Sequence, residues 1–144
     1  MRAWKTLFTV ISAMLYLSSG IAGPSIEGNW ITIDDKTGVR QAVANFVIKD
    51  GTLAATIAGV FPQPGDTGIC SECPGEFKNQ PIKGLQFAWG LKEATPGIWD
   101  GGHILDAKTG KIYRVKMSMK GDKLYVRGYI GLAMMGRTQI WIRG

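Results

Sequence analysis

Short apolar runs separated by turn-forming residues constrain this chain more than any other feature of its sequence. The runs are rich in β-branched and aromatic residues, and no window sustains a helical period. Most are joined by short turns such as Asp50-Gly51, a dipeptide favoured in hairpins because it tolerates positive φ. The pattern predicts eight strands, over residues 28–33, 40–48, 52–60, 82–91, 98–105, 112–119, 123–130 and 137–143.

Consecutive hairpins of this kind favour an antiparallel meander. Eight antiparallel strands without a covering helix can protect their edges by closing on themselves, so the sequence predicts an all-β, eight-stranded up-and-down barrel. A two-sheet sandwich is the alternative, because it also uses short strands and glycine-rich turns. The Pro/Gly-rich segment 61–81 is too central to divide the chain and is predicted to be one long loop.

The N-terminal residues have the three-part layout of a secretory signal peptide. Arg2 and Lys5 precede the apolar run 7–17, and small residues follow. The run is about half the length needed to cross a bilayer as a helix, and no cysteine lies near the expected cut after Ala22. We therefore expect a signal peptide over residues 1–22, and a single periplasmic or secreted domain over residues 23–144 with no membrane anchor.

Basic residues outnumber acidic ones, but they are scattered along the sequence. Loss of Arg2 and Lys5 from the 17 Lys and Arg residues would leave 15, against 11 Asp and Glu. The remaining cations occur singly, without the clustered stripe and interleaved aromatic residues of a nucleic-acid surface. We expect no nucleic-acid partner.

Period-two alternation places apolar side chains along one face of several predicted strands. Aromatic residues and methionines are notable among them, because they give adaptable contacts to small apolar ligands. An eight-stranded barrel can hold one small ligand, although side chains fill most of its inward positions, so core packing is the other role open to each residue. The candidate lining residues are Phe87, Trp89, Trp99, Met117, Met119, Tyr125 and Tyr129.

The sequence Gly28-Asn29-Trp30 on the first predicted strand, together with Arg143 on the last, resembles the lipocalin pattern. In that superfamily the tryptophan of Gly-x-Trp plugs one end of the barrel, and a late arginine packs over its indole. A guanidinium over a buried indole contributes about 0.5–2 kcal/mol of cation–π attraction. The resemblance implies structural roles for Trp30 and Arg143.

A second resemblance covers nearly the whole chain after residue 27. The segments GNWITIDDKTG, CSECPGEFKNQPIKGLQFAWGL, WDGGHILDAKTGKIY and LYVRGYIGLAMMGRTQIWIR resemble the bacterial family called domain of unknown function 2147. The resemblance implies export, a lipocalin-like barrel and no established enzymatic activity. Ala107 departs from the turn proline expected after Asp106, and His103 occupies a position that the family pattern does not restrict.

No catalytic constellation is evident in the sequence. A Ser-His-Asp arrangement would need His103 with Asp100 or Asp106, but no nucleophile elbow of the form Gly-x-Ser-x-Gly occurs. Asp34 and Asp35 begin a turn, where aspartates bond their own backbone, and neighbours on a strand point to opposite faces. The Thr-Gly-Lys sequence at 109–111 opens a strand and not the helix of a phosphate loop.

Cys70 and Cys73, the only two cysteines, allow three interpretations. A redox pair would sit at the start of a helix, and the prolines and glycine around it leave little room for one. A metal site needs about four ligands, which these thiols and His103 do not supply unless Glu72 or Glu76 joins. In an oxidising compartment a structural disulfide is favoured, contributing about 2 kcal/mol for so short a ring.

The sequence leads us to expect an exported, non-enzymatic barrel that needs no cofactor and binds a small apolar or amphipathic ligand. Two other functions stay open. One is thiol–disulfide chemistry through Cys70 and Cys73. The other is an envelope interaction module that uses the apolar segment 131–136, with Leu132, Met134 and Met135, unless that segment folds inward as a lid.

Overall fold

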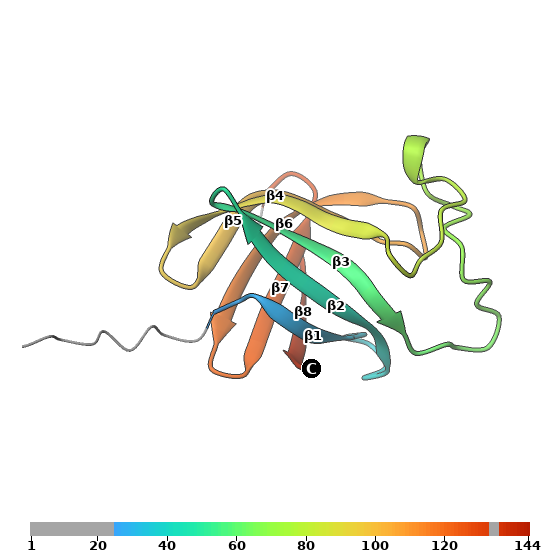
Figure 1. Ribbon diagram of the computed structural model, residues 1–144, viewed down its shortest axis with the longest axis horizontal. Helices are drawn as coiled ribbons and strands as arrows, with labels where there is room; N and C mark the ends of the chain where they lie inside the picture. Colours follow the sequence, from blue (N-terminus) through green and yellow to red (C-terminus); the bar gives the residue numbers. More distant parts are fainter. Residues whose placement is uncertain (1–24, 133–135) are drawn as a thin grey trace, which may run out of the picture.

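A computed structural model describes residues 25–132 and 136–144 as one closed antiparallel sheet (Figure 1). The predictions that concern residues 1–24, Met134 and Met135 lie outside the described residues. No helix in the described part of the chain is long and apolar enough to cross a bilayer. The strands are β1 (Gly28–Ile33), β2 (Arg40–Lys49), β3 (Thr52–Val60), β4 (Gln86–Thr95), β5 (Ile98–Leu105), β6 (Ile112–Lys120), β7 (Lys123–Tyr129) and β8 (Arg137–Arg143).

Each strand pairs with the next along the chain, and β8 returns to pair with β1. The predicted eight-stranded up-and-down barrel is therefore confirmed, and the two-sheet sandwich is excluded. Three hairpin turns, β2–β3, β4–β5 and β6–β7, lie at the end of the barrel where β1 begins, on the left in Figure 1. We call this the hairpin end.

Strand β4 is the one strand whose predicted bounds were displaced by several residues. It runs from Gln86 to Thr95, whereas the apolar pattern predicted residues 82–91. Gly84 has a φ of +91°, and the N–H of Leu85 donates to the carbonyl of Ile82, so the chain turns there before the strand begins. At the other end, the Pro96-Gly97 turn lets the hairpin with β5 continue through charged residues.

Two irregularities in the pairing of β3 with β4 change which side chains face the interior. Phe87 has no partner between the pairs Ala55–Ala88 and Thr56–Gln86, and both Phe87 and Ala88 are buried. A bulge of this kind reverses the alternation of the residues that follow. Trp89 consequently leaves the face that it was predicted to share with Phe87.

The barrel interior is filled by large apolar side chains. Trp30, Phe46, Met117 and Trp141 are buried, and the Trp141 ring lies 6.3 Å from that of Phe46 and 6.1 Å from that of Phe87, measured between centroids. Edge-on and tilted aromatic pairs at these separations add attraction beyond their burial.

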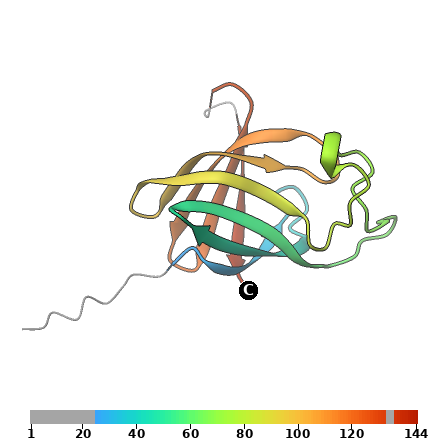
Figure 2. The same ribbon diagram turned by 45° about the horizontal axis from the view of Figure 1, so that its top comes forward.

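The two sides of the long β3–β4 loop are bonded to each other near the barrel (Figure 2). Ile69 and Pro81 form an isolated bridge, and the N–H of Cys70 donates to the carbonyl of Gln80 at 2.8 Å. The loop carries the short 3-10 helix η1 (Gly75–Phe77) and contacts the β5–β6 turn at Gly110. A Cβ atom on Gly110 would lie 1.8 Å from the carbonyl oxygen of Glu72, so only glycine permits this contact.

The seam between β1 and β8 is the shortest pairing in the barrel. Only Trp30–Arg143 and Ile31–Ile142 are in register, and beyond them the strands diverge. The Arg137 Nε atom donates to both carboxylate oxygens of Asp35 at 2.7 and 2.6 Å across the divergence. These hydrogen bonds lower the pKa of Asp35 and raise that of Arg137.

The lowered pKa of Asp35 makes a prediction about stability against pH. The ion pair favours the folded state above the unfolded-state pKa of about 3.9, and its contribution is lost as pH falls through the lower folded-state pKa. Asp35→Asn should therefore cost up to about 1 kcal/mol of unfolding free energy near pH 7. The difference from wild type should vanish in acid. Urea unfolding over a pH series, with Asp50→Asn as a charge-matched control, checks this, and a gap independent of pH would contradict it.

Candidate functional site

A cavity of about 290 Å³ lies at the hairpin end of the barrel. Its walls come from the segment before β1, the end of β2, the β4–β5 hairpin and the end of β6. The lining residues are Ser25, Ile26, Ile48, Glu93, Pro96, Gly97, Trp99 and Met119. We call it the end cavity.

The β4–β5 hairpin is placed over the end cavity by its turn. Gly97 has a φ of +79°, a conformation that favours glycine, and its carbonyl accepts a hydrogen bond from the N–H of Met119 at 2.9 Å. Trp99 is paired with Met117 in the β5–β6 register, which directs its buried indole to the inner face. Turn chemistry and strand register together bring Trp99 and Met119 to the same wall.

The segment before β1 forms another part of the lining and is held by hydrogen bonds to β1 and β2. The Trp30 Nε1 atom donates to the carbonyl of Ile26 at 2.8 Å, and the carboxylate of Glu27 accepts from the N–H of Ile48 at 2.8 Å. Ile26 is buried as a result. Hydrogen bonds therefore hold the backbone of residues 26–27 in place beside the cavity.

Arg143 joins the buried Trp30 to the end cavity. Its Cζ atom lies 4.0 Å from the centroid of the Trp30 ring, and Nη1 donates to the carbonyl of Glu27 at 2.9 Å. Nη2 donates to the carbonyl of Ser25 and lies 3.8 Å from the Met119 sulfur. One guanidinium thus holds β8, β1, the preceding segment and a cavity-lining methionine together.

The chemistry of the end cavity suits binding better than catalysis. Five of its eight lining residues have apolar side chains, and the charged residue among them is the exposed Glu93. The Ser25 hydroxyl already accepts the N–H of Glu27 at 3.1 Å. The described residues contain no group of three or more His, Cys, Asp or Glu side chains that could hold a metal ion.

The candidate lining residues separate into three places. Trp99 and Met119 line the end cavity, whereas Phe87 and Met117 are packed in the core. Trp89 lies outside the barrel wall, where its ring stacks between Phe77 at 5.5 Å and His103 at 5.9 Å. The bulge in β4 accounts for this displacement.

Tyr125 and Tyr129 also differ from the prediction. In β7 the inward positions are those of the buried Leu124 and Val126, so the two tyrosines lie on the outer side of the sheet, where Tyr125 is half-buried and Tyr129 is covered. The Lys120 ammonium lies 4.6 Å from the Tyr125 ring centroid, and the Arg114 guanidinium lies 5.9 Å from that of Tyr129. Their aromatic side chains suggested that they line the interior, but in β7 they alternate with the inward-facing Leu124 and Val126 and so lie on the other side of the sheet.

Several residues of the end cavity were not expected from the sequence. Ile48 lies at the end of β2, whereas Glu93, Pro96 and Gly97 belong to the β4–β5 hairpin, far along the chain from it. In an up-and-down meander, alternate turns share one end of the barrel, so listing the residues beside those turns would have gathered this set. Residue composition and the alternation of apolar residues do not by themselves indicate which residues line this cavity.

A second cavity, of about 390 Å³, lies over the divergent seam. It is lined by Ile33, Asp34, Asp35, Gly38, Thr138 and Ile140. Asp34 holds the turn here, because its carboxylate accepts the N–H groups of Lys36 and Thr37 at 2.9 Å, and the bond from Thr37 is the main cause of its lowered pKa. Asp34 therefore has the turn role expected of it, and its oxygens are engaged there.

His103 and its candidate partners are engaged locally. His103 stacks on Trp89, outside the barrel wall. The carboxylate of Asp100 accepts the N–H of Gly101 at 2.8 Å, and that of Asp106 accepts the N–H of Lys108 at 2.9 Å. The Asp106 carboxylate therefore stabilises the β5–β6 turn, and the Asp100 carboxylate bonds the backbone at the irregularity in β5 between Trp99 and Gly102.

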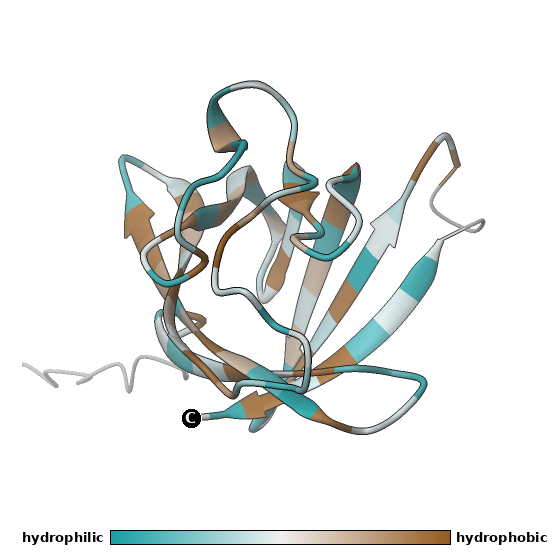
Figure 3. Ribbon diagram, turned by 90° about the vertical axis from the view of Figure 1, so that its right-hand side faces the viewer, coloured by the Kyte–Doolittle hydropathy of each residue, from teal (hydrophilic) through white to brown (hydrophobic). Residues whose placement is uncertain are grey.

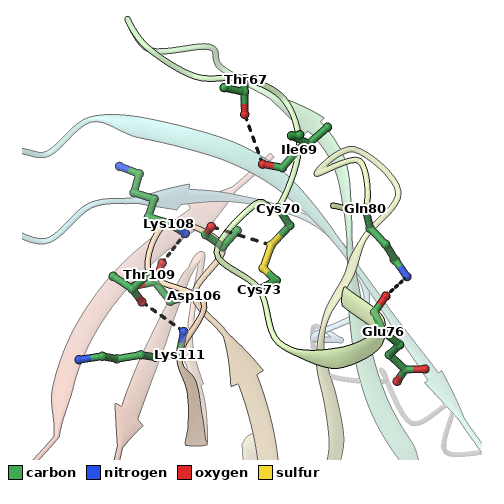
Figure 4. Close-up of a disulfide and its surroundings, with 11 residues drawn as sticks. Thr67, Ile69, Cys70, Cys73, Glu76, Gln80, Asp106, Lys108, Thr109 and Lys111 are labelled. Carbon is green, nitrogen blue, oxygen red and sulfur yellow. Dashed lines mark hydrogen bonds between the residues drawn. A yellow bond between two sulfur atoms is a disulfide. The ribbon is translucent and has the colours of Figure 1, made fainter. Parts of the chain in front are cut away.

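Cys70 and Cys73 lie at disulfide distance in the long loop (Figure 4). Both residues are buried, and the Cys70 sulfur faces the carbonyl of Ala107 in the β5–β6 turn. Burial restricts access of an attacking thiolate to either sulfur. These surroundings favour a structural disulfide that holds the β3–β4 loop beside the β5–β6 turn.

Comparison with known proteins gives a family and a fold. Residues 28–143 match the family described as "uncharacterized protein conserved in bacteria (DUF2147)". None of the curated proteins matches the chain. A solved structure, protein HP1028 of Helicobacter pylori, is described as belonging to the lipocalin family. It superposes with a TM-score of 0.74 at 19% identity, over 85% of this chain and 84% of that one, a likeness that shows the fold.

Removal of the Arg143 side chain should destabilise the barrel. Arg143→Ala loses the cation–π contact and two charge-assisted hydrogen bonds, for an expected loss of about 3 kcal/mol of unfolding free energy in urea. Arg143→Lys keeps the charge without the planar fork and should lose about half as much. Lys111→Ala, at an exposed position, is the control, and equal stability of Arg143→Ala and this control would contradict the assigned role.

The buried disulfide should resist reduction. Incubation of the folded protein with glutathione at cytosolic poise should leave Cys70 and Cys73 unlabelled by a thiol-specific alkylating reagent, because structural disulfides have low reduction potentials. Cys70→Ser with Cys73→Ser should lower the unfolding free energy by about 2 kcal/mol. Rapid labelling of the native protein under those conditions would instead support the thiol–disulfide function.

Proposed function

Because the chain belongs to the bacterial family described as DUF2147, whose description names no activity, we propose a function from its own site: it is an exported, non-enzymatic protein that binds one small amphipathic molecule in the end cavity. The lipocalin-like fold fits a ligand-binding protein. The signal-peptide pattern before Ala22 supports export to the periplasm or the medium.

The end cavity is the observation that carries this proposal. Its volume of about 290 Å³ is near the lower end of the usual range for ligand pockets, about 300–1,000 Å³, so the ligand should be small. Trp99 and Met119 provide a flat and a deformable apolar contact. The barrel centre is an inferior candidate, because Phe46, Met117 and Trp141 are buried against one another there.

Glu93 favours a ligand with a positive or hydrogen-bond-donating group. Its carboxylate only accepts hydrogen bonds, and it lines a cavity that is otherwise mainly apolar. The Arg143 guanidinium nearby is already engaged with two backbone carbonyls and the Trp30 ring. A short alkylammonium is therefore expected to bind better than the matching alkylcarboxylate.

Filling the end cavity should abolish binding. Ile48→Phe adds volume inside the cavity, so it should weaken binding of the neutral probe N-phenyl-1-naphthylamine at least about tenfold, as measured by its fluorescence. Val47→Phe is the matched control on the same strand, because Val47 is 51% exposed and lies outside the wall. Equal affinity in both variants, with both folded, would contradict binding at this site.

A further inference from the structure

Charge is segregated along this sequence although no run of cations occurs. Residues 107–144 contain nine of the 17 Lys and Arg residues but only one of the 11 Asp and Glu residues, Asp122. That segment therefore has a net charge of +8, while residues 1–106, with eight basic and ten acidic residues, have −2. Charge asymmetry of this size suggests contact with a nucleic acid or a membrane.

The fold gathers these cations onto one outer surface. In β6, cations alternate with the buried Val115 and Met117, so they face outwards, and the β6–β7 register places the cations of β7 beside them. Lys116 lies opposite Arg127, and Lys120 lies opposite Lys123. We call this set the basic face: Arg114, Lys116, Lys120, Lys123 and Arg127.

Like charges in direct cross-strand register destabilise a sheet. The salt bridges found among the described residues join Arg137 to Asp34 and Asp35, away from the basic face. Lys116, Lys120 and Lys123 take part in none of them, so the positive charge of these three side chains stays available to an external anion.

An apolar tip continues directly from one end of the basic face. Ile130 and Leu132, at the end of β7, are 68% and 65% exposed, the highest exposures among the large hydrophobic residues described. The described residues just after β7 project from the barrel wall in Figure 2, and Figure 3 shows this stretch coloured mostly as hydrophobic. We call Ile130 and Leu132 the apolar tip.

Exposed aliphatic side chains beside cations and tyrosines have the composition of a peripheral membrane contact. Cations attract anionic headgroups, and aliphatic side chains enter the boundary of the acyl chains. A single-stranded nucleic acid would need open aromatic faces for stacking. Here Tyr125 lies beneath Lys120, and Tyr129 is only 8% exposed beside Arg114.

We infer that the basic face and the apolar tip dock this protein onto the surface of an anionic phospholipid membrane. The inference is independent of the end cavity, which opens at the hairpin end and has none of these residues in its lining. The cations that contact the headgroups extend along β6 and β7, from Lys120 and Lys123 at the β6–β7 turn to Arg114 near the other end, where Ile130 and Leu132 enter the interface. The attachment is peripheral and falls away with salt.

Vesicle co-sedimentation tests the inference with the protein as purified from cells. Binding is expected to vesicles of phosphatidylcholine with about one-third phosphatidylglycerol, and not to phosphatidylcholine alone, because the basic face needs anionic headgroups. Raising salt from about 0.1 to about 0.5 M should weaken binding at least about tenfold by screening. Equal binding to both vesicle types would overturn the inference.

Matched variants distinguish binding through the basic face from attraction by the net charge of the whole protein. Lys116→Gln with Lys120→Gln should reduce binding about tenfold or more, whereas Lys36→Gln with Lys49→Gln removes the same charge from other exposed positions and should have little effect. Equal losses in the two pairs would show attraction by net charge only. Because both pairs keep the same N-terminus, residual binding through that segment cancels in the comparison.

The apolar tip has its own test. Ile130→Ser with Leu132→Ser should weaken vesicle binding severalfold with no change in charge, and Val47→Ser, at another exposed aliphatic position, should not. Thermal unfolding confirms that each variant is folded. If a single-stranded oligonucleotide binds the wild type more tightly than the anionic vesicles and displaces them, the basic face is a nucleic-acid site and the inference fails.

Discussion

Closure of the sheet depends on the contact between Trp30 and Arg143. The two strands that must meet share only two register pairs, so hydrogen bonding between them contributes little. The guanidinium compensates, because it covers the buried indole and also binds two carbonyls of the segment before β1. This one side chain covers the Trp30 indole, holds the segment that lines the end cavity and joins the first strand to the last.

The inner and outer faces of the barrel separate two kinds of chemistry. Inside, aromatic and aliphatic side chains fill the centre and leave space only at the hairpin end, where Trp99 and Met119 meet the segment around Ile26. Outside, the same alternation directs the cations of β6 and β7 to solvent. A ligand in the end cavity and an anionic surface on the basic face would not compete, because they use different sides of the wall.

The strands and their order could be predicted from the sequence, because short turns and alternating apolar residues specify a meander locally. Alternation failed where a bulge intervened: Phe87 was buried as its pattern indicated, but Trp89, two residues later, faced outwards. Tyr125 was predicted to line the interior because it is aromatic, although it alternates with Leu124 and Val126, which are the inward-facing residues. The end cavity could not be predicted, since Ile48, Glu93 and Met119 become neighbours only once the register of several hairpins is known.

The contact of Trp30 with Arg143 also has a consequence for the order of events during synthesis. The first strand emerges early, but its indole has no cover until the eighth strand exists, so nearly the whole domain must be made before the sheet can close. Contacts between such distant residues form slowly, and unpaired edges invite association with other chains meanwhile. Until β8 pairs with β1, the chain therefore has two open sheet edges, and association through those edges is the hazard that late closure brings.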